Sequence, residues 1–159
     1  MTRQDLVLRY IAYAVMLAVV ATGLVGLIER ESSARASSGS GDVDVEYPRI
    51  TRQGLKPTLV VEVRNAAPVA RVPVLVLSGE YLEALQLEGV TPEPAEAAAV
   101  GDGLVEYRFA ALAPGVMLRA SLAMSIDQQA PGVRFTSPLT VALGGRVLLD
   151  ARITTVVLP

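Results

Sequence analysis

Regularly spaced carboxylates are the first residues in this chain that could do chemistry. Asp42, Asp44 and Glu46 alternate with apolar residues, so an extended strand would place all three on one face. Clustered carboxylate oxygens are the ligands that Ca²⁺ prefers. At this spacing, however, the three residues extend over about 13 Å, which is too far for one ion without help from loops. We therefore interpret them as the charged face of an edge strand and predict no metal site.

A second acidic group, made of Glu80, Glu83 and Glu88, could supply the acid and base of a glycosidase. The chain has no Trp and only 4% aromatic residues, which argues against a sugar site. It also has no His and no Cys, which excludes the usual nucleophilic triads and the ordinary zinc, haem and iron–sulfur sites. Lys56 is its one lysine, and it belongs to no Ser-x-x-Lys motif. The sequence therefore predicts a protein that is not an enzyme and that has no catalytic residue and no cofactor.

Charge and length narrow the function classes further. The chain has 159 residues, 14 basic and 16 acidic, so its net charge of −2 gives no reason to expect nucleic-acid binding. A chain of this length is expected to form one main domain. Without Cys, an exported domain has no disulfides and must be stabilised by its core alone.

An uncharged apolar segment predicts membrane attachment. Residues 10–28 read YIAYAVMLAVVATGLVGLI, and a helix of this length rises roughly 28 Å, close to the thickness of the hydrocarbon core. We predict a retained signal anchor, with residues 1–9 as a short cytoplasmic tail. The alternative is a cleaved signal peptide, since Ala34, Arg35 and Ala36 form an A-x-A motif before Ser37. Either alternative places the C-terminal part outside the cytoplasmic membrane, with the N-terminus of a retained anchor inside.

Small residues recur every four positions within this segment. Ala14, Ala18, Thr22 and Gly26 would lie along one face of a helix, where a second helix can approach closely. This spacing predicts a helix-packing seam for self-association or for an integral membrane partner. The alternative is a chance stripe, because small residues are common in such segments.

The rest of the chain predicts a tether and an all-β domain. Residues 29–41 are rich in Ser and Gly, which favours a flexible linker. Residues 42–159 show period-two alternation, as at Leu59, Val61 and Val63 and most clearly from Leu118 to Ile126, between turns rich in Gly and Pro. Gly144 and Gly145 indicate a two-residue hairpin turn, and Glu80 to Leu85 a single helical turn. Seven or eight strands in this length favour a β-sandwich over a closed barrel.

Two stretches resemble a known class of module. Residues 59–77, LVVEVRNAAPVARVPVLVL, and residues 104–126, LVEYRFAALAPGVMLRASLAMSI, look like bacterial extracellular immunoglobulin-like modules of the CARDB and related repeat type. The resemblance rests on a strand that ends in Asn65 and on a turn formed by Leu112, Pro114 and Gly115. It implies an immunoglobulin-like sandwich that serves as a spacer or assembly unit and has no shared catalytic site.

These observations predict a membrane-anchored extracytoplasmic interaction module that contacts another envelope or membrane protein. The alternative is a carrier or lipid-binding module with an apolar cavity between its sheets. A filled core with an exposed apolar patch or edge strand would favour the first, and an internal cavity the second. Residues 92–103, PEPAEAAAVGDG, could form a docking loop because the prolines favour an extended backbone, although an ordinary connection between strands is the simpler interpretation.

Overall fold

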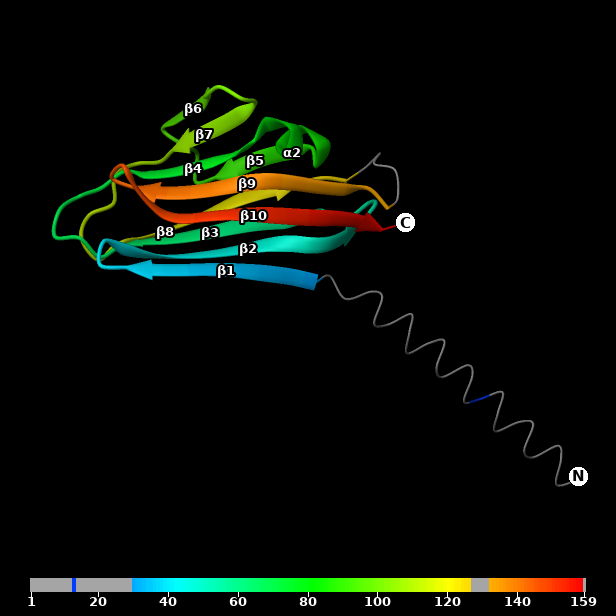
Figure 1. Cartoon of the computed structure of the whole chain (residues 1–159), viewed down its shortest axis with the longest axis horizontal. Coiled ribbons are helices and arrows are strands. Elements are labelled where there is room, and N and C mark those ends of the chain that lie inside the picture. Colours follow the sequence, from blue (N-terminus) through cyan, green and yellow to red (C-terminus); the bar gives the residue numbers. More distant parts are fainter. Residues whose placement is uncertain (1–12, 14–29, 127–131, 159) are drawn as a thin grey trace, which may run out of the picture.

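The computed structural model of the chain describes Tyr13, residues 30–126 and residues 132–158. Ten strands and one short helix make up residues 30–158 of this described part (Figure 1). In chain order they are β1 (Arg30–Ser38), β2 (Gly41–Arg52), β3 (Thr58–Asn65), β4 (Pro73–Ser78), α2 (Gly79–Ala84), β5 (Leu87–Thr91), β6 (Glu96–Ala99), β7 (Leu104–Arg108), β8 (Met117–Met124), β9 (Arg134–Leu143) and β10 (Arg146–Leu158).

The ten strands form one hydrogen-bonded sheet in the order β5-β8-β3-β2-β10-β9-β4-β7-β6, and β1 pairs with β2 outside this path. The sheet is continuous because β2 changes its neighbour along its length. Residues 41–46 pair with β3 in antiparallel orientation, and residues 50–52 pair with β10 in parallel. The sheet therefore curls over on itself, and β9 and β10 run in front of β3 and β8 in Figure 1.

The predicted fold class is wrong. Instead of an immunoglobulin-like β-sandwich of seven or eight strands, the described residues form ten strands in one curled sheet. None of the helices that the structure describes is long and apolar enough to cross a membrane. Apart from Tyr13, the predicted transmembrane segment 10–28 lies outside the described residues, and so does the predicted seam at Ala14, Ala18, Thr22 and Gly26. Alternation identifies strands and their inward faces, but it does not encode which strands are hydrogen-bonded to each other.

The predicted flexible linker is largely a strand. Residues 30–38 form β1, which pairs with β2 from end to end. Polar groups support this pairing, because Arg35 Nε contacts Asp44 Oδ2 at 2.7 Å and Ser37 Oγ donates to Asp42 Oδ1 at 2.5 Å. This strand could not be identified from the sequence because its residues show no alternation of apolar and polar side chains. The candidate cleavage motif therefore lies inside β1, and cleavage after Ala36 would leave only two residues of that strand.

The inward-facing side chains fill the space between the two halves of the curled sheet. The alternation predicted for residues 59–63 is confirmed, since Leu59, Val61 and Val63 are buried. The predicted hairpin turn at Gly144 and Gly145 is also confirmed, and both residues have positive φ, as a two-residue turn of this kind requires. Besides Tyr81, Leu59 and Val45, the largest fully buried side chains are Leu75, Leu77, Leu85, Leu122, Met124, Ile126, Leu139, Leu143 and Ile153.

The short helix α2 adds a buried polar chain to this core. Ser78 caps the helix by accepting a hydrogen bond from the backbone N–H of Tyr81. The hydroxyl of Tyr81 lies 2.8 Å from Thr155 Oγ1, which itself donates to the carbonyl oxygen of Pro48 at 2.6 Å. Burial raises the pKa of Tyr81 to about 12, although the hydrogen bond with Thr155 opposes the shift. The phenol is therefore a neutral, structural group.

Candidate functional site: the loop end

Four connections between strands meet at one end of the sheet, on the left of Figure 1. They are the β1–β2 turn (residues 39–40), the β3–β4 loop (66–72), the β7–β8 loop (109–116) and the β9–β10 turn (144–145). We call this region the loop end. β1 enters the loop end at Ser38, whereas its first residue, Arg30, lies at the opposite end of the strand.

Asn65 holds the two longer loops together. Its side chain is fully buried at the end of β3. Its Nδ2 donates to the carbonyl oxygens of Val69, at 2.9 Å, and Leu112, at 2.8 Å, while its Oδ1 accepts from the backbone N–H of Ala67 at 3.0 Å. An asparagine suits this position because its short amide can bond to the backbone two residues later and still reach a second loop. One side chain thus fixes both loops.

Backbone hydrogen bonds complete the framework. Arg71 and Leu112 exchange two bonds, of 3.0 and 2.8 Å. The N–H of Gly115 donates to the carbonyl oxygen of Asn65 at 2.7 Å, and Gly144 donates to that of Val72 at 2.9 Å. The ordered loops therefore present a defined surface.

That surface is unusually apolar for loops. Five of the eight exposed large hydrophobic residues in the described part lie at or beside the loop end: Val69, Val72, Val116, Met117 and Val147. Val69 is 56% exposed and Val116 46%. The sequences of the two longer loops, AAPVARV and FAALAPGV, contain Ala, Val and Pro where polar residues are usual. This composition was the signal in the sequence that could have identified the region.

Three arginines accompany the apolar residues. Arg71 belongs to the β3–β4 loop, while Arg64 and Arg146 are exposed at the neighbouring strand ends. The two longer loops contain no acidic residue. Arg146 Nη1 donates to Ser40 Oγ at 3.1 Å, which ties the β1–β2 turn to β10. The loop end thus combines an apolar surface with positive charge.

A shallow groove of about 690 Å³ borders the loop end on the outer face of β1, β2, β3 and β8. Arg64 and Met117 line it, together with Arg35, Asp44 and Glu62. Arginines bind two of its carboxylates, since Arg35 contacts Asp44 and Arg119 Nη1 lies 3.3 Å from Glu62 Oε1. Asp44 Oδ1 is buried and has no hydrogen-bond partner among the described residues. The groove is therefore a charged surface next to the apolar loops.

The structure places the carboxylates considered from the sequence in separate surroundings. Asp42 and Asp44 contact β1, and within the described residues no group of three or more acidic side chains is placed to bind a metal ion. Glu88 is paired with Lys56 at 2.9 Å. Glu80 and Glu83 are exposed on α2. Within residues 92–103, four residues form β6, which pairs with β7, so part of the suggested docking loop is an ordinary hairpin.

Three hollows in the described part lie on its outer surfaces. Besides the groove, one lies against residues of β2, β9 and β10, and another lies between α2 and the β6–β7 turn. The space between the halves is occupied by buried Leu, Val, Met and Ile side chains.

Comparison with protein-family models finds no match, and comparison with curated proteins finds none. Among solved structures, the backbone is similar to the Pseudomonas fluorescens alkylpurine DNA glycosylase AlkC bound to DNA containing an abasic site analog, with 14% identity and a TM-score of 0.36 over 69% of this chain and 28% of that one. AvmM, which catalyses macrocyclization in alchivemycin A biosynthesis, has 8% identity and a TM-score of 0.41 over 83% of this chain and 96% of that one. A Listeria innocua β-glucosidase in complex with gluconolactone has 12% identity and a TM-score of 0.36 over 80% of this chain and 16% of that one. We draw no functional conclusion from these similarities.

Proposed function

We propose that this protein is a non-enzymatic interaction module, anchored in the cytoplasmic membrane by residues 10–28, which docks an envelope or membrane protein through its loop end. The observation that carries the proposal is the exposed apolar surface around Val69 and Val116 on loops that Asn65 holds rigid. Exposed apolar patches of this kind on folded domains mark interaction sites. Rigid loops also lose little conformational entropy on binding.

The charges at the loop end define the partner. Arg71 lies in one of the two longer loops, which contain no acidic residue, and Arg64 and Arg146 lie at the adjoining strand ends, with Asp42 across the ladder from Arg64. A complementary protein surface has an apolar centre with carboxylates at its rim. Attachment to the same membrane would raise the effective concentration of such a partner, so that a modest interface suffices. The groove beside the loops, with Arg64 and Glu62, extends this surface with polar contacts.

Site-specific crosslinking in native membranes tests the docking. A photo-crosslinking residue replaces Val116 in the full-length chain, and a matched control places it at Val100, which is also exposed but lies between β6 and β7. The proposal expects an adduct with one envelope protein from position 116 and none from position 100. The purified partner is then titrated with Val116→Asp and Arg64→Glu variants, and each should weaken binding by about tenfold or more. Equal adducts at both positions, or unchanged affinity of both variants, would refute docking through the loop end.

Anchoring is tested separately. Alkaline extraction of membranes should leave the full-length chain in the pellet and release a variant that lacks residues 10–28. Protease added to intact spheroplasts should remove the β domain while sparing residues 1–9. Release of the full-length chain by alkali would contradict the anchor without affecting the docking proposal.

A further inference from the structure

Three strands in the described part have a neighbour on one side only: β1, β5 and β6. An unpaired strand edge offers free N–H and C=O groups, and proteins usually protect such edges with short strands, prolines, bulges or charges. β5 has five residues and a register shift between Leu87 and Gly89, with the Lys56–Glu88 ion pair beside it. β6 has four residues and follows Pro92 and Pro94. Both edges are therefore protected.

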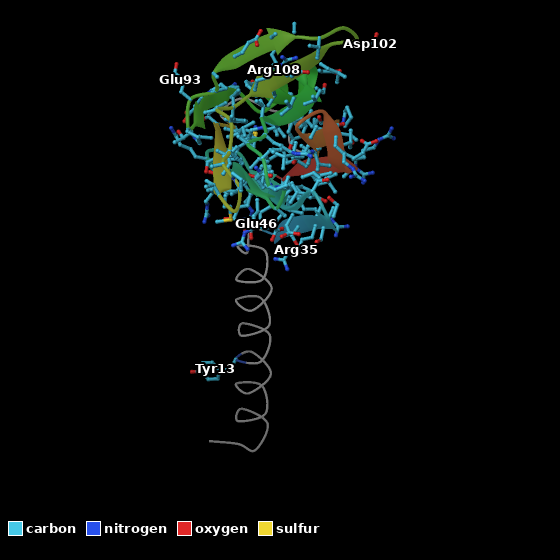
Figure 2. The ribbon with its side chains drawn as sticks, turned by 90° about the vertical axis from the view of Figure 1, so that its left-hand side faces the viewer. Tyr13, Arg35, Glu46, Glu93, Asp102 and Arg108 are labelled. Atoms are coloured by element: carbon cyan, nitrogen blue, oxygen red, sulfur yellow. The ribbon has the colours of Figure 1, made fainter. Side chains whose placement is uncertain are left out.

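Charged side chains, Glu31 and Arg35, are the only one of these protections that β1 has along most of its length. It has nine residues, RESSARASS, without Pro, Gly or Lys, and its one register shift is at the Arg30/Glu31 step. From Glu31, which pairs with Pro48, to Ser38, which pairs with Gly41, β1 follows a regular ladder along β2. In such a ladder every second residue directs its backbone N–H and C=O to the outer edge. Figure 2 shows Arg35 at the margin of the β domain opposite Asp102.

The side chains of β1 are complementary to themselves. Glu31, Ser33, Arg35 and Ser37 alternate with half-buried neighbours and share the exposed face. If two β1 strands pair antiparallel around a two-fold axis at Ser33, Glu31 of each copy lies opposite Arg35 of the other. Opposite charges directly across a strand pair stabilise it, and the small Ser and Ala side chains between them allow close approach.

Arg35 is placed to bridge the two copies. Its Nε contacts Asp44 Oδ2 at 2.7 Å in its own chain, and its side chain is 71% exposed. A guanidinium has five N–H donors, so the remaining ones are available for a second carboxylate. Asp44 thus orients Arg35 while leaving it able to meet Glu31 of a second copy.

We infer that the chain forms a two-fold homodimer in which the β1 edges of two copies pair antiparallel, centred on Ser33, and join their sheets into one. This symmetric contact is isologous and closed, so it uses up both free β1 edges and stops at two copies. It does not involve the loop end. The two loop ends lie at opposite ends of the dimer, where both can bind partners.

The absence of Cys makes the register directly testable, because any introduced cysteine is the only one in the chain. In the full-length chain in membranes, Ser33→Cys should crosslink to itself on mild oxidation, since directly opposite Cβ atoms are about 5 Å apart. The matched control is Ser37→Cys, on the same exposed face. In this register the two Cys residues of that variant would be about 26 Å apart and should not crosslink. Equal crosslinking of the two variants, or none from Ser33→Cys, would overturn the inference.

Charge reversal supplies a second test that does not depend on oxidation geometry. In the Ser33→Cys background, Glu31→Arg alone and Arg35→Glu alone each place like charges opposite each other and should lose most of the crosslink. A mixture of the two variants restores both Glu–Arg pairs across the heterodimer and should recover it. Circular dichroism of each variant controls for folding. Failure of the mixture to recover the crosslink, with both variants folded, would refute this register even if residues 10–28 associate.

Discussion

The side-chain amide of Asn65 donates a hydrogen bond of 2.8 Å to the carbonyl oxygen of Leu112, 47 residues further along the chain. The same nitrogen also bonds to Val69, and the amide oxygen accepts from Ala67. A single buried side chain therefore connects the end of β3 to two loops that no regular ladder joins. The apolar surface that we propose as the docking site depends on this connection.

Replacing Asn65 by Ala should destabilise the protein by about 2 to 4 kcal/mol, because the backbone groups of Ala67, Val69 and Leu112 lose their buried partner. Urea unfolding of the full-length chain in detergent, followed by circular dichroism, measures this loss. Asn65→Asp is the informative companion variant. It keeps the acceptor for Ala67 but turns a carboxylate oxygen toward two carbonyls, so it should not rescue stability. A loss within about 0.5 kcal/mol for Asn65→Ala would contradict the role of this side chain.

Gly41 and Gly39 offer a matched pair at the β1–β2 turn. A Cβ on Gly41 would lie 2.3 Å from the carbonyl oxygen of Arg64, which is fixed in the β2–β3 ladder, whereas a Cβ on Gly39 meets nothing within 4 Å. Gly41→Ala should therefore force β2 and β3 apart and cost about 2 kcal/mol or more, and Gly39→Ala should change stability by less than about 0.5 kcal/mol. Thermal unfolding of both variants checks the difference. Similar melting temperatures for the two would show that the close approach of β2 to β3 is unimportant.

The buried phenol of Tyr81 should make the fold sensitive to alkali. Its pKa is raised from 10.0 to about 12 in the folded protein, so the folded state retains the proton to higher pH than the unfolded state does. Its contribution to stability is therefore complete below pH 10 and is lost as the pH rises from 10 to 12, with a slope of at most about 1.4 kcal/mol per pH unit. The free energy of unfolding, measured by urea titration at several pH values, reports this slope.

Two tyrosine variants test whether Tyr81 causes the loss of stability between pH 10 and pH 12. Tyr81→Phe should remove the steepest part of the fall in the free energy of unfolding with pH. Near neutral pH the same variant should be less stable by about 1 kcal/mol, because it loses the hydrogen bond to Thr155. Tyr107→Phe is the comparison, because burial also raises the pKa of Tyr107 but the decline due to Tyr81 should persist without it. If the free energy of unfolding of Tyr81→Phe still falls as steeply between pH 10 and pH 12 as that of the unmodified protein, another group is responsible.

Local patterns predicted much of the strand content correctly. The alternation at Leu59, Val61 and Val63 identified the inward face of β3, and the glycines at 144 and 145 identified the hairpin between β9 and β10. Both signals are local, since burial on one face and positive φ constrain the residue types directly. β1 was missed for the converse reason. Its residues are Ser, Ala, Glu and Arg, with no large apolar side chain on either face, and it is held by backbone bonds and by the contacts of Arg35 and Ser37 with β2.

The sequence by itself determined that the chain has no His or Cys chemistry, that most of its described part is extended, and which face of most strands is buried. Only the tertiary structure decided that β2 bonds to β3 with one half and to β10 with the other, which makes a single curled sheet. It also decided that Asn65 meets Leu112 and that, among the described strands, β1 pairs with β2 alone. Side-chain alternation records only whether a residue faces the core. Strand order and contacts between distant loops depend on backbone hydrogen bonds, which are chemically the same for nearly every residue type.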